Sequence, residues 1–414
     1  MHSKKLVVIG GGAAGFFLAV NAARLNPQLK VILLEKTGKL LSKVKVSGGG
    51  RCNVTHACFS IPELVKKYPR GEQFLKKAFH LFNTKDTIEW FSERGVQLHA
   101  EADGRMFPVT NDSRTIINCL LKEADTYKVD VRLNSDVNRI ETTADAFRIH
   151  ITGQEMIAAD FVAVTCGGFS KPAMFQWLKD TGHEIEPPVP SLFTFNIPRH
   201  PITALMGLSV SNAVVKIAGT KLKEQGPLLI THWGLSGPVV LRLSAWGARE
   251  LSKANYQFTI LVNWLGDCAE TDLRQDWAGY REQFAAQKIL NRNPFGLPGR
   301  LWQFFLEQCN IPETTRWAEL KAKEQNKLIQ LLTAFPFTVS GKTTFKDEFV
   351  TAGGIALSGI NPQTMESKKV SNLFFAGEVM DVDGITGGFN FQNAWTSAFI
   401  AATTIATRLN DRLS

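Results

Sequence analysis

The stretch Leu6-Val7-Val8-Ile9-Gly10-Gly11-Gly12-Ala13-Ala14-Gly15 decides the fold of this chain. Its four apolar residues predict a short buried strand, and the apolar, Ala-containing residues 16–26 predict a helix. A second apolar strand at 30–34 ends at Glu35, which follows the last glycine by 20 residues. A G-x-G-x-x-G turn between a strand and a helix, with an acid at that distance, is typical of dinucleotide-binding folds.

Each part of this turn has a predicted task. Gly10 permits the tight turn, Gly12 lets a pyrophosphate approach the backbone, and Gly15 lets the helix pack closely on the strand. The N–H groups of the first helical turn, at Ala13 and Ala14, favour an anion. Glu35 would accept hydrogen bonds from ribose hydroxyls, which disfavours a 2′-phosphate and predicts FAD or NAD rather than NADP. The alternative is a glycine-rich turn in an unrelated α/β protein.

The composition is that of an ordinary globular protein. The chain has 414 residues, enough for two or three domains, and is 44% hydrophobic and 21% charged. These values exclude disordered, collagenous and coiled-coil chains. Lys and Arg number 47 against 38 Asp and Glu, a formal charge of +9. The surplus is compatible with nucleotides, phosphorylated substrates or RNA as partners, and equally with a generally basic surface.

Cysteine usage and hydropathy bear on the compartment. The six cysteines are scattered and do not form a disulfide framework. No apolar run reaches the roughly 18 residues of a membrane helix, and no signal-peptide pattern is present. We therefore expect a cytoplasmic protein without membrane contact. The histidines show no metal-ligand spacing, and no metal is expected.

Further along the chain, the pattern predicts helices at about 73–93 and 113–125, the second capped by Ser113. Cys166, at the end of an apolar strand, is predicted to be a core residue. The residue pattern predicts mainly strands at about 191–265 and helices at 266–335. Strand-like sequence then returns before a predicted helix at 391–408. We expect an α/β fold in which parts 1–190 and 341–414 flank an insertion at 191–340.

Five separated motifs resemble one flavoprotein family. They are Ser47-Gly-Gly-Gly-Arg-Cys-Asn53, Gly104-Arg-Met-Phe-Pro108, Thr231-His-Trp-Gly-Leu-Ser-Gly-Pro238, Thr351-Ala-Gly-Gly-Ile355 and the long stretch from Ala376 to Trp395. With the N-terminal fingerprint, they are similar to the HI0933-like (YhiN/BaiN-type) bacterial flavoproteins of the two-dinucleotide-binding-domain superfamily. The resemblance implies a Rossmann-like FAD-binding domain of the glutathione-reductase type, split by an inserted β-rich module and a helical module.

The resemblance and the motifs together give a predicted FAD-binding set. Besides the fingerprint residues and Glu35, the set contains Lys36, Ser47, Gly48, Gly49, Gly50, Arg51, Cys52, Asn53, Val137, Thr165, Gly167, Gly168, Gly377, Glu378, Asp383, Gly387, Gly388, Phe389 and Asn390. The turn at 387–390 opens the last predicted helix, whose N–H groups would stabilise the negative charge of a reduced flavin. A plain helix start after a glycine turn is the alternative.

Two residues are candidates for catalysis. His232, in a glycine-rich turn of the insertion, could move a proton to or from the substrate; a packed, hydrogen-bonded histidine is the alternative. Arg105, like Arg51, could hold an anionic substrate or the pyrophosphate, or form a surface salt bridge. Cys52 and Cys58 could form a redox-active disulfide, although their spacing differs from that of flavin disulfide reductases, and inert thiols are the alternative. We expect the insertion to cover the flavin, with His232, Arg105 and the loop 48–53 at the reacting face.

The predicted function is an FAD-dependent oxidoreductase that transfers hydride through a non-covalently bound flavin to a small-molecule substrate. A transient visit by NAD(P)H is one candidate electron source. Two alternatives stay open. One is a flavin-dependent RNA-modifying enzyme, motivated by the charge and by the basic, Trp-bearing helical tract, although acids such as Glu307 and Glu319 are interspersed there. The other is a non-catalytic flavin redox sensor.

Overall fold

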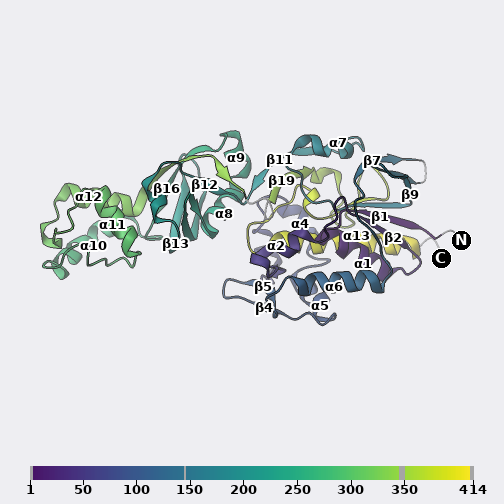
Figure 1. The fold of residues 1–414 in the computed structure, drawn as a ribbon, viewed down its shortest axis with the longest axis horizontal. Coiled ribbons are helices and arrows are strands. Elements are labelled where there is room, and N and C mark those ends of the chain that lie inside the picture. Colours follow the sequence, from purple (N-terminus) through teal and green to yellow (C-terminus); the bar gives the residue numbers. More distant parts are fainter. Residues whose placement is uncertain (1–2, 144–145, 345–349, 411–414) are drawn as a thin grey trace. The chain divides into compact units, whose positions relative to one another are not determined.

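The computed structural model describes residues 3–143, 146–344 and 350–410. It contains two compact units, which we describe separately: unit 1 comprises residues 1–191 and 346–414, and unit 2 comprises residues 192–345 (Figure 1).

The centre of unit 1 is a parallel sheet of five strands in the order β20-β10-β1-β2-β6. Its strands are β1 (Lys5–Ile9), β2 (Lys30–Leu34), β6 (Asp130–Arg132), β10 (Phe161–Val164) and β20 (Leu373–Phe375). β1 and β10 read as continuous apolar runs because the sheet is buried on both faces. β20 comes from the C-terminal part and pairs with β10, so the two ends of the chain share one sheet. The predicted α/β fold class is confirmed.

Two long helices pack on each other beside this sheet. α1 (Ala13–Leu25) contacts α13 (Phe389–Asn410), and α6 (Arg114–Thr126) lies against α1. Buried polar contacts fix α13 to the N-terminal part: Trp395 donates to the Val54 carbonyl at 2.9 Å, and Gln392 accepts from Thr55 at 2.6 Å. The last helix is therefore part of the N-terminal core.

Smaller elements surround the central layer of unit 1. They are the sheet β3 (Thr55–His56), β5 (Arg105–Pro108) and β4 (Leu98–Ala100); the sheet β7 (Val137–Thr142), β8 (Phe147–Ile151) and β9 (Ile157–Ala159); the pair β11 (Ile185–Ser191) and β19 (Val350–Ile355); and the helices α2 (Ser42–Gly50), α3 (Ile61–Val65), α4 (Glu72–Ala78), α5 (Thr84–Ser92) and α7 (Gln176–Lys179).

Two local predictions in unit 1 are wrong. The single helix expected at 73–93 is two helices, because Asn83 starts α5 with a capping box in which its side chain and Asp86 satisfy backbone N–H groups. Ser113 precedes α6 as expected but does not cap it. Its hydroxyl instead donates to the Lys45 carbonyl at 2.9 Å, tying α6 to the α2 segment.

Unit 2 contains an antiparallel sheet of seven strands in the order β17-β16-β13-β14-β15-β12-β18. The strands are β12 (Thr194–Asn196), β13 (Ser209–Ile217), β14 (Lys223–Thr231), β15 (Gly234–Ser236), β16 (Gln257–Asn263), β17 (Phe335–Ser340) and β18 (Lys342–Thr343). The helices are α8 (Pro238–Trp246), α9 (Ala248–Lys253), α10 (Glu270–Gln283), α11 (Gly299–Gln308) and α12 (Ala322–Ala334). Four buried tryptophans, at 264, 277, 302 and 317, belong to its core.

None of the helices among the described residues combines the length and the apolar character that crossing a membrane requires.

Candidate functional site

The glycine turn between β1 and α1 leaves an open cradle at one position. A Cβ atom on Gly15 would lie 1.8 Å from the Gly10 carbonyl oxygen, and one on Gly10 would lie 2.6 Å from the Cys166 Cα. A Cβ on Gly12 would meet nothing within 4 Å. Gly10 and Gly15 are thus required by the protein's own packing, while Gly12 borders free space at the start of α1. No side chain caps that helix end, so its N–H groups are available to an anion.

Glu35 lies at the end of β2, beside the glycine turn. Its carboxylate accepts hydrogen bonds at 2.8 Å from the Gly11 N–H, the Thr37 N–H and the Thr37 hydroxyl. A carboxylate offers about four acceptor positions, so one remains for a ribose hydroxyl. The next residue, Lys36, forms an ion pair of 3.2 Å with Asp136.

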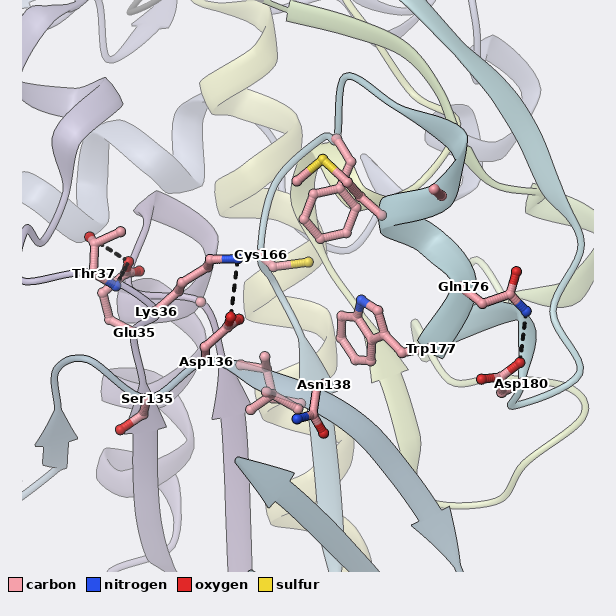
Figure 2. A pocket seen from close by; sticks show the side chains of 16 residues that line it. Glu35, Lys36, Thr37, Ser135, Asp136, Asn138, Cys166, Gln176, Trp177 and Asp180 are labelled. Carbon is pink, nitrogen blue, oxygen red and sulfur yellow. Dashed lines mark hydrogen bonds and ion pairs between the residues drawn. The ribbon is translucent and has the colours of Figure 1, made fainter. Parts of the chain in front are cut away.

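A cavity of about 490 Å³ extends from this turn toward α7. Its lining includes the predicted residues Gly10, Glu35, Lys36 and Val137. Figure 2 shows Trp177 projecting into this space toward Cys166, with Asp136 and Asn138 opposite. A pocket that joins an aromatic ring, apolar side chains and the ribose-binding acid suits an adenosine group.

Sequence reasoning missed most of the lining. The additional residues are Ile9, Thr37, Ser135, Asp136, Asn138, Cys166, Phe169, Ala173, Met174, Gln176, Trp177 and Asp180. Apart from Ile9 and Thr37, they come from segments about 100 and 140 residues beyond Glu35, and no local spacing connects those segments to the fingerprint. Cys166 is not a core residue as predicted, because it is half-buried and lines the cavity. Burial raises the pKa of its thiol to about 12, so the thiol stays protonated.

The other predicted residues on this side form a cluster behind the turn. The Thr165 hydroxyl donates to the carbonyl of Ile9 at 3.0 Å. Gly167 has a φ of +76° and open space on its Cβ side, while Gly168 lies close to Thr351 and Glu378. Glu378 accepts from the Thr351 N–H at 2.9 Å and forms an ion pair of 2.6 Å with Lys43.

The C-terminal segment returns to the glycine turn at Gly377 and packs on β3 at the start of α13. A Cβ on Gly377 would lie 3.0 Å from that of Ala14, so the turn after β20 touches the first turn of α1. Gly387 and Gly388 have φ values of +134° and +91°, and α13 begins at Phe389. Gly388 is packed against the Thr55 carbonyl, where a Cβ would lie 2.5 Å away. The helix N-terminus is therefore held next to β3.

The loop 47–53 rests on the β4–β5 hairpin. Its glycines at 48, 49 and 50 all have positive φ, and a Cβ on Gly48 would lie 2.8 Å from the Phe107 ring. Arg51 lies 4.0 Å above that ring and pairs with Glu101 at 2.7 Å. Arg105 pairs with the same Glu101 and with Asp103, both at 2.7 Å. Both arginines are thus salt-bridged, which is the alternative considered for them above.

Asn53 and His56 link this loop to α13. In the amide orientation that satisfies both groups, Asn53 accepts from the Gly388 N–H and donates to the Thr55 carbonyl, each at 3.0 Å. The His56 ring stacks on Phe389 with a centroid separation of 4.7 Å, and burial lowers the pKa of His56. Cys52 is fully buried, which raises the pKa of its thiol to about 12. All six cysteines are free, including Cys52 and Cys58. The burial and raised pKa of Cys52 favour an inert thiol at that position.

Two predicted cofactor ligands use their side chains within the protein. The Asp383 carboxylate is completely buried, and it accepts from Arg70 through both oxygens and from the Ser191 hydroxyl at 2.8 Å. Burial raises the pKa of Asp383, against the opposing effect of Arg70 and Ser191. Asn390 exchanges hydrogen bonds of 2.8 and 2.9 Å with the backbone of Gly384. Both side chains stabilise the turn before α13. At these two positions, only backbone groups are therefore left to bind a ligand.

His232 lies in unit 2, apart from the FAD-binding set. It occupies the two-residue turn between β14 and β15, is exposed, and contacts Trp233 edge-on with a centroid separation of 4.2 Å. Within the residues that the structure describes, no group of three His, Cys, Asp or Glu side chains could hold a metal ion.

These features fit an extended dinucleotide. The cavity at Glu35 and Trp177 matches an adenosine, the open cradle at Gly12 matches a pyrophosphate, and the start of α13 offers N–H groups to the far end. Every predicted cofactor residue lies in unit 1, and the set is drawn from both of its chain segments.

Comparisons with known proteins agree with this reading. A ribosomal RNA dihydrouridine synthase of Haemophilus influenzae is 30% identical over 413 residues, 97% of this chain and 98% of that protein. A protein of the same name from Escherichia coli is 29% identical over 96% of both chains. A 3-dehydro-bile acid delta(4,6)-reductase of Clostridium scindens is 26% identical over 98% of this chain and 99% of that protein.

The family described as HI0933-like protein Rossmann domain matches residues 4–404, almost the whole chain. This span includes the fingerprint, both parts of unit 1 and all of unit 2. The chain is an FAD-dependent oxidoreductase, and it belongs to the HI0933-like family.

Proposed function

We propose that this protein reduces a carbon–carbon double bond conjugated to a carbonyl group, and that its substrate is a uridine of ribosomal RNA. The observation that carries the proposal is the similarity, over nearly the full length of both chains, to two proteins named ribosomal RNA dihydrouridine synthase. The RNA-modifying alternative raised from the sequence is the one favoured here. The overall charge of +9 suits a polyanionic substrate.

The reaction class also accommodates the bile acid relative. Reduction of a uridine to dihydrouridine and reduction of a Δ4,6-3-oxo steroid both add a hydride to one carbon of a conjugated alkene and a proton to another. Bound FAD, once reduced by two electrons from a donor, would supply the hydride. The protein must supply the proton and hold the substrate, and a steroid substrate is the second candidate because of the 26% identical relative.

For the proton we propose His232, and for substrate orientation we propose Arg105. Imidazole is suited to proton transfer near neutral pH. An exposed turn leaves the ring of His232 accessible to a substrate. In this proposal, the cavity at Glu35 and the cradle at Gly12 only hold the cofactor. We also propose that NADH or NADPH donates the electrons to the flavin.

The substrate is tested with ribosomal RNA from an E. coli strain that lacks the 29% identical relative, so that this relative has not already modified the RNA. The purified, FAD-loaded protein should convert a uridine to a nucleoside that is 2 mass units heavier, seen by mass spectrometry after digestion, when NADH or NADPH is present. A Δ4,6-3-oxo steroid in place of RNA tests the second candidate. Reduced steroid with unchanged RNA would reject the RNA proposal, and anaerobic flavin bleaching by either nicotinamide identifies the donor.

The proposed acid is tested in the same assay. His232→Ala should lower turnover at least about 100-fold, the usual size of a general acid–base contribution, without changing FAD content or the flavin spectrum. His80→Ala, which removes another exposed histidine, is the matched control. Equal turnover in the two variants would reject His232 as the proton donor.

A further inference from the structure

The sheet of unit 2 has one face that buries the core and one that carries exposed side chains. On β13 and β14 the buried residues Val215, Ile217 and Leu228 face α8, and Arg242 of α8 pairs with Glu224 on this same side at 3.0 Å. The residues between them point to the other face because side chains alternate along a strand. There Lys216 and Lys223 are exposed.

Positive charge is concentrated in the β-rich part of unit 2. Residues 191–265 contain seven Lys and Arg against two Asp and Glu, while residues 266–335 contain nine of each. The helical tract therefore has no net charge, and the positive excess of unit 2 comes from its β-rich part. Of the two acids in 191–265, Glu224 is paired with Arg242 and Glu250 lies on α9. Neither forms an ion pair with Lys216, Lys221 or Lys223 among the described residues.

Three lysines crowd one end of that face. Lys216 and Lys223 stand directly opposite each other in the β13–β14 ladder, and Lys221 lies in the turn that joins these strands. Like charges directly across a ladder destabilise a sheet. Among the described residues, no acidic side chain forms an ion pair with any of the three, so the protein itself gains nothing from their charge. A polyanion bound across them would remove the repulsion.

We propose that this lysine face, defined by Lys216, Lys221 and Lys223 with the flanking Val214, Gln225 and Thr259, binds the phosphate backbone of the RNA substrate. The inference rests on the proposed function and adds the surface that holds the substrate. The described residues of β13, β14, β16 and β17 include no exposed aromatic side chain on which bases could stack. The contact is therefore electrostatic and independent of base sequence.

The lysine face is distant from the proposed acid. β14 runs from Lys223 to Thr231, next to His232, and eight steps of about 3.4 Å place the two ends roughly 27 Å apart. Changes at the lysine face therefore leave His232 untouched. They should weaken RNA binding without altering the flavin.

The test is the double variant Lys216→Glu/Lys223→Glu. Its matched control is Lys288→Glu/Lys323→Glu, which makes the same charge change at two exposed lysines of the helical tract. Binding of the FAD-loaded proteins to fluorescent ribosomal RNA fragments is measured across salt concentrations. Loss of two phosphate contacts should weaken binding about 25-fold near 0.1 M salt and lower the salt slope by roughly 1.4. The control should stay within about threefold of the wild type.

The outcomes separate this inference from the proposed function. Equal weakening by the two double variants, or an unchanged salt slope in the first, overturns the lysine face while leaving uridine reduction by the wild type intact. A wild type that neither binds nor reduces ribosomal RNA overturns both. Unaltered FAD absorbance and thermal unfolding of the Lys216/Lys223 variant ensure that a loss of binding is not a loss of fold.

Discussion

Replacement of Gly12 by valine should weaken FAD binding by at least about 10-fold to 100-fold without unfolding the protein. The backbone at Gly12 has φ −90° and ψ −168°, which any residue adopts, and a Cβ there meets nothing within 4 Å. The cost to the free protein should be about 1 kcal/mol, because glycine is a better helix N-cap residue than valine. The new side chain would fill the space that a pyrophosphate needs at the start of α1. Loss of one or two charge-assisted hydrogen bonds, each about 1.5–3 kcal/mol, predicts at least a 10-fold to 100-fold weaker affinity.

Gly15→Ala provides the contrast. Its Cβ would lie 1.8 Å from the Gly10 carbonyl oxygen, so β1 and α1 would have to separate. We expect a loss of about 3 kcal/mol or more in the free energy of unfolding, the upper range for overpacking. Gly279→Ala, at an exposed glycine with open space inside α10 of unit 2, is the control for the loss of a glycine. It should leave FAD affinity unchanged and raise stability by about 1 kcal/mol, the usual gain when alanine replaces glycine inside a helix.

The assay compares proteins stripped of FAD, because bound cofactor would itself stabilise the wild type. Urea unfolding gives the stability of each apoprotein, and titration with FAD gives its affinity. A Gly12→Val protein that binds FAD like the wild type would refute the assignment of the cradle to the pyrophosphate. A Gly15→Ala protein of unchanged stability would refute the packing argument.

Two other predictions follow from contacts in unit 1. Residues 1–190 expressed alone should not retain FAD, because β20 and α13 would be missing and Thr55 would lose its buried partner Gln392. If this fragment bound FAD with the affinity of the whole chain, the cofactor domain would not need both ends of the sequence. Burial lowers the pKa of His183 from 6.5 to about 4, and its ring nitrogens contact Thr181 and Ser367. Between pH 6.5 and pH 4 the unfolded chain therefore takes up a proton at this histidine that the folded chain does not. Stability should fall by about 3 kcal/mol between pH 7 and pH 4 on this account, and urea unfolding of His183→Gln should show a correspondingly smaller decrease.

The sequence by itself determined the features that depend on local spacing. The order strand, glycine turn, helix, strand and acid can be recognised because the residues involved lie within 30 positions, from Leu6 to Glu35, and each glycine answers a local steric demand. The parallel sheet and the dinucleotide site follow from that pattern, and the separated motifs placed the chain in its family. The basic charge was also visible, although only as a total.

The tertiary structure decided which distant side chains meet. Trp177 and Asp136 line the cavity beside Glu35 because α7 and the segment before β7 pack near the end of β2, a contact that no periodicity encodes. Aspartate and asparagine are common cofactor ligands, which is why Asp383 and Asn390 are predicted as such. The Asp383 carboxylate is instead hydrogen-bonded to Arg70, more than 300 residues away in the sequence. The lysine face likewise depends on the register of β13 with β14, which sets Lys216 opposite Lys223. Spacing along the chain describes local geometry, whereas burial and pairing are set by long-range packing that only the folded chain provides.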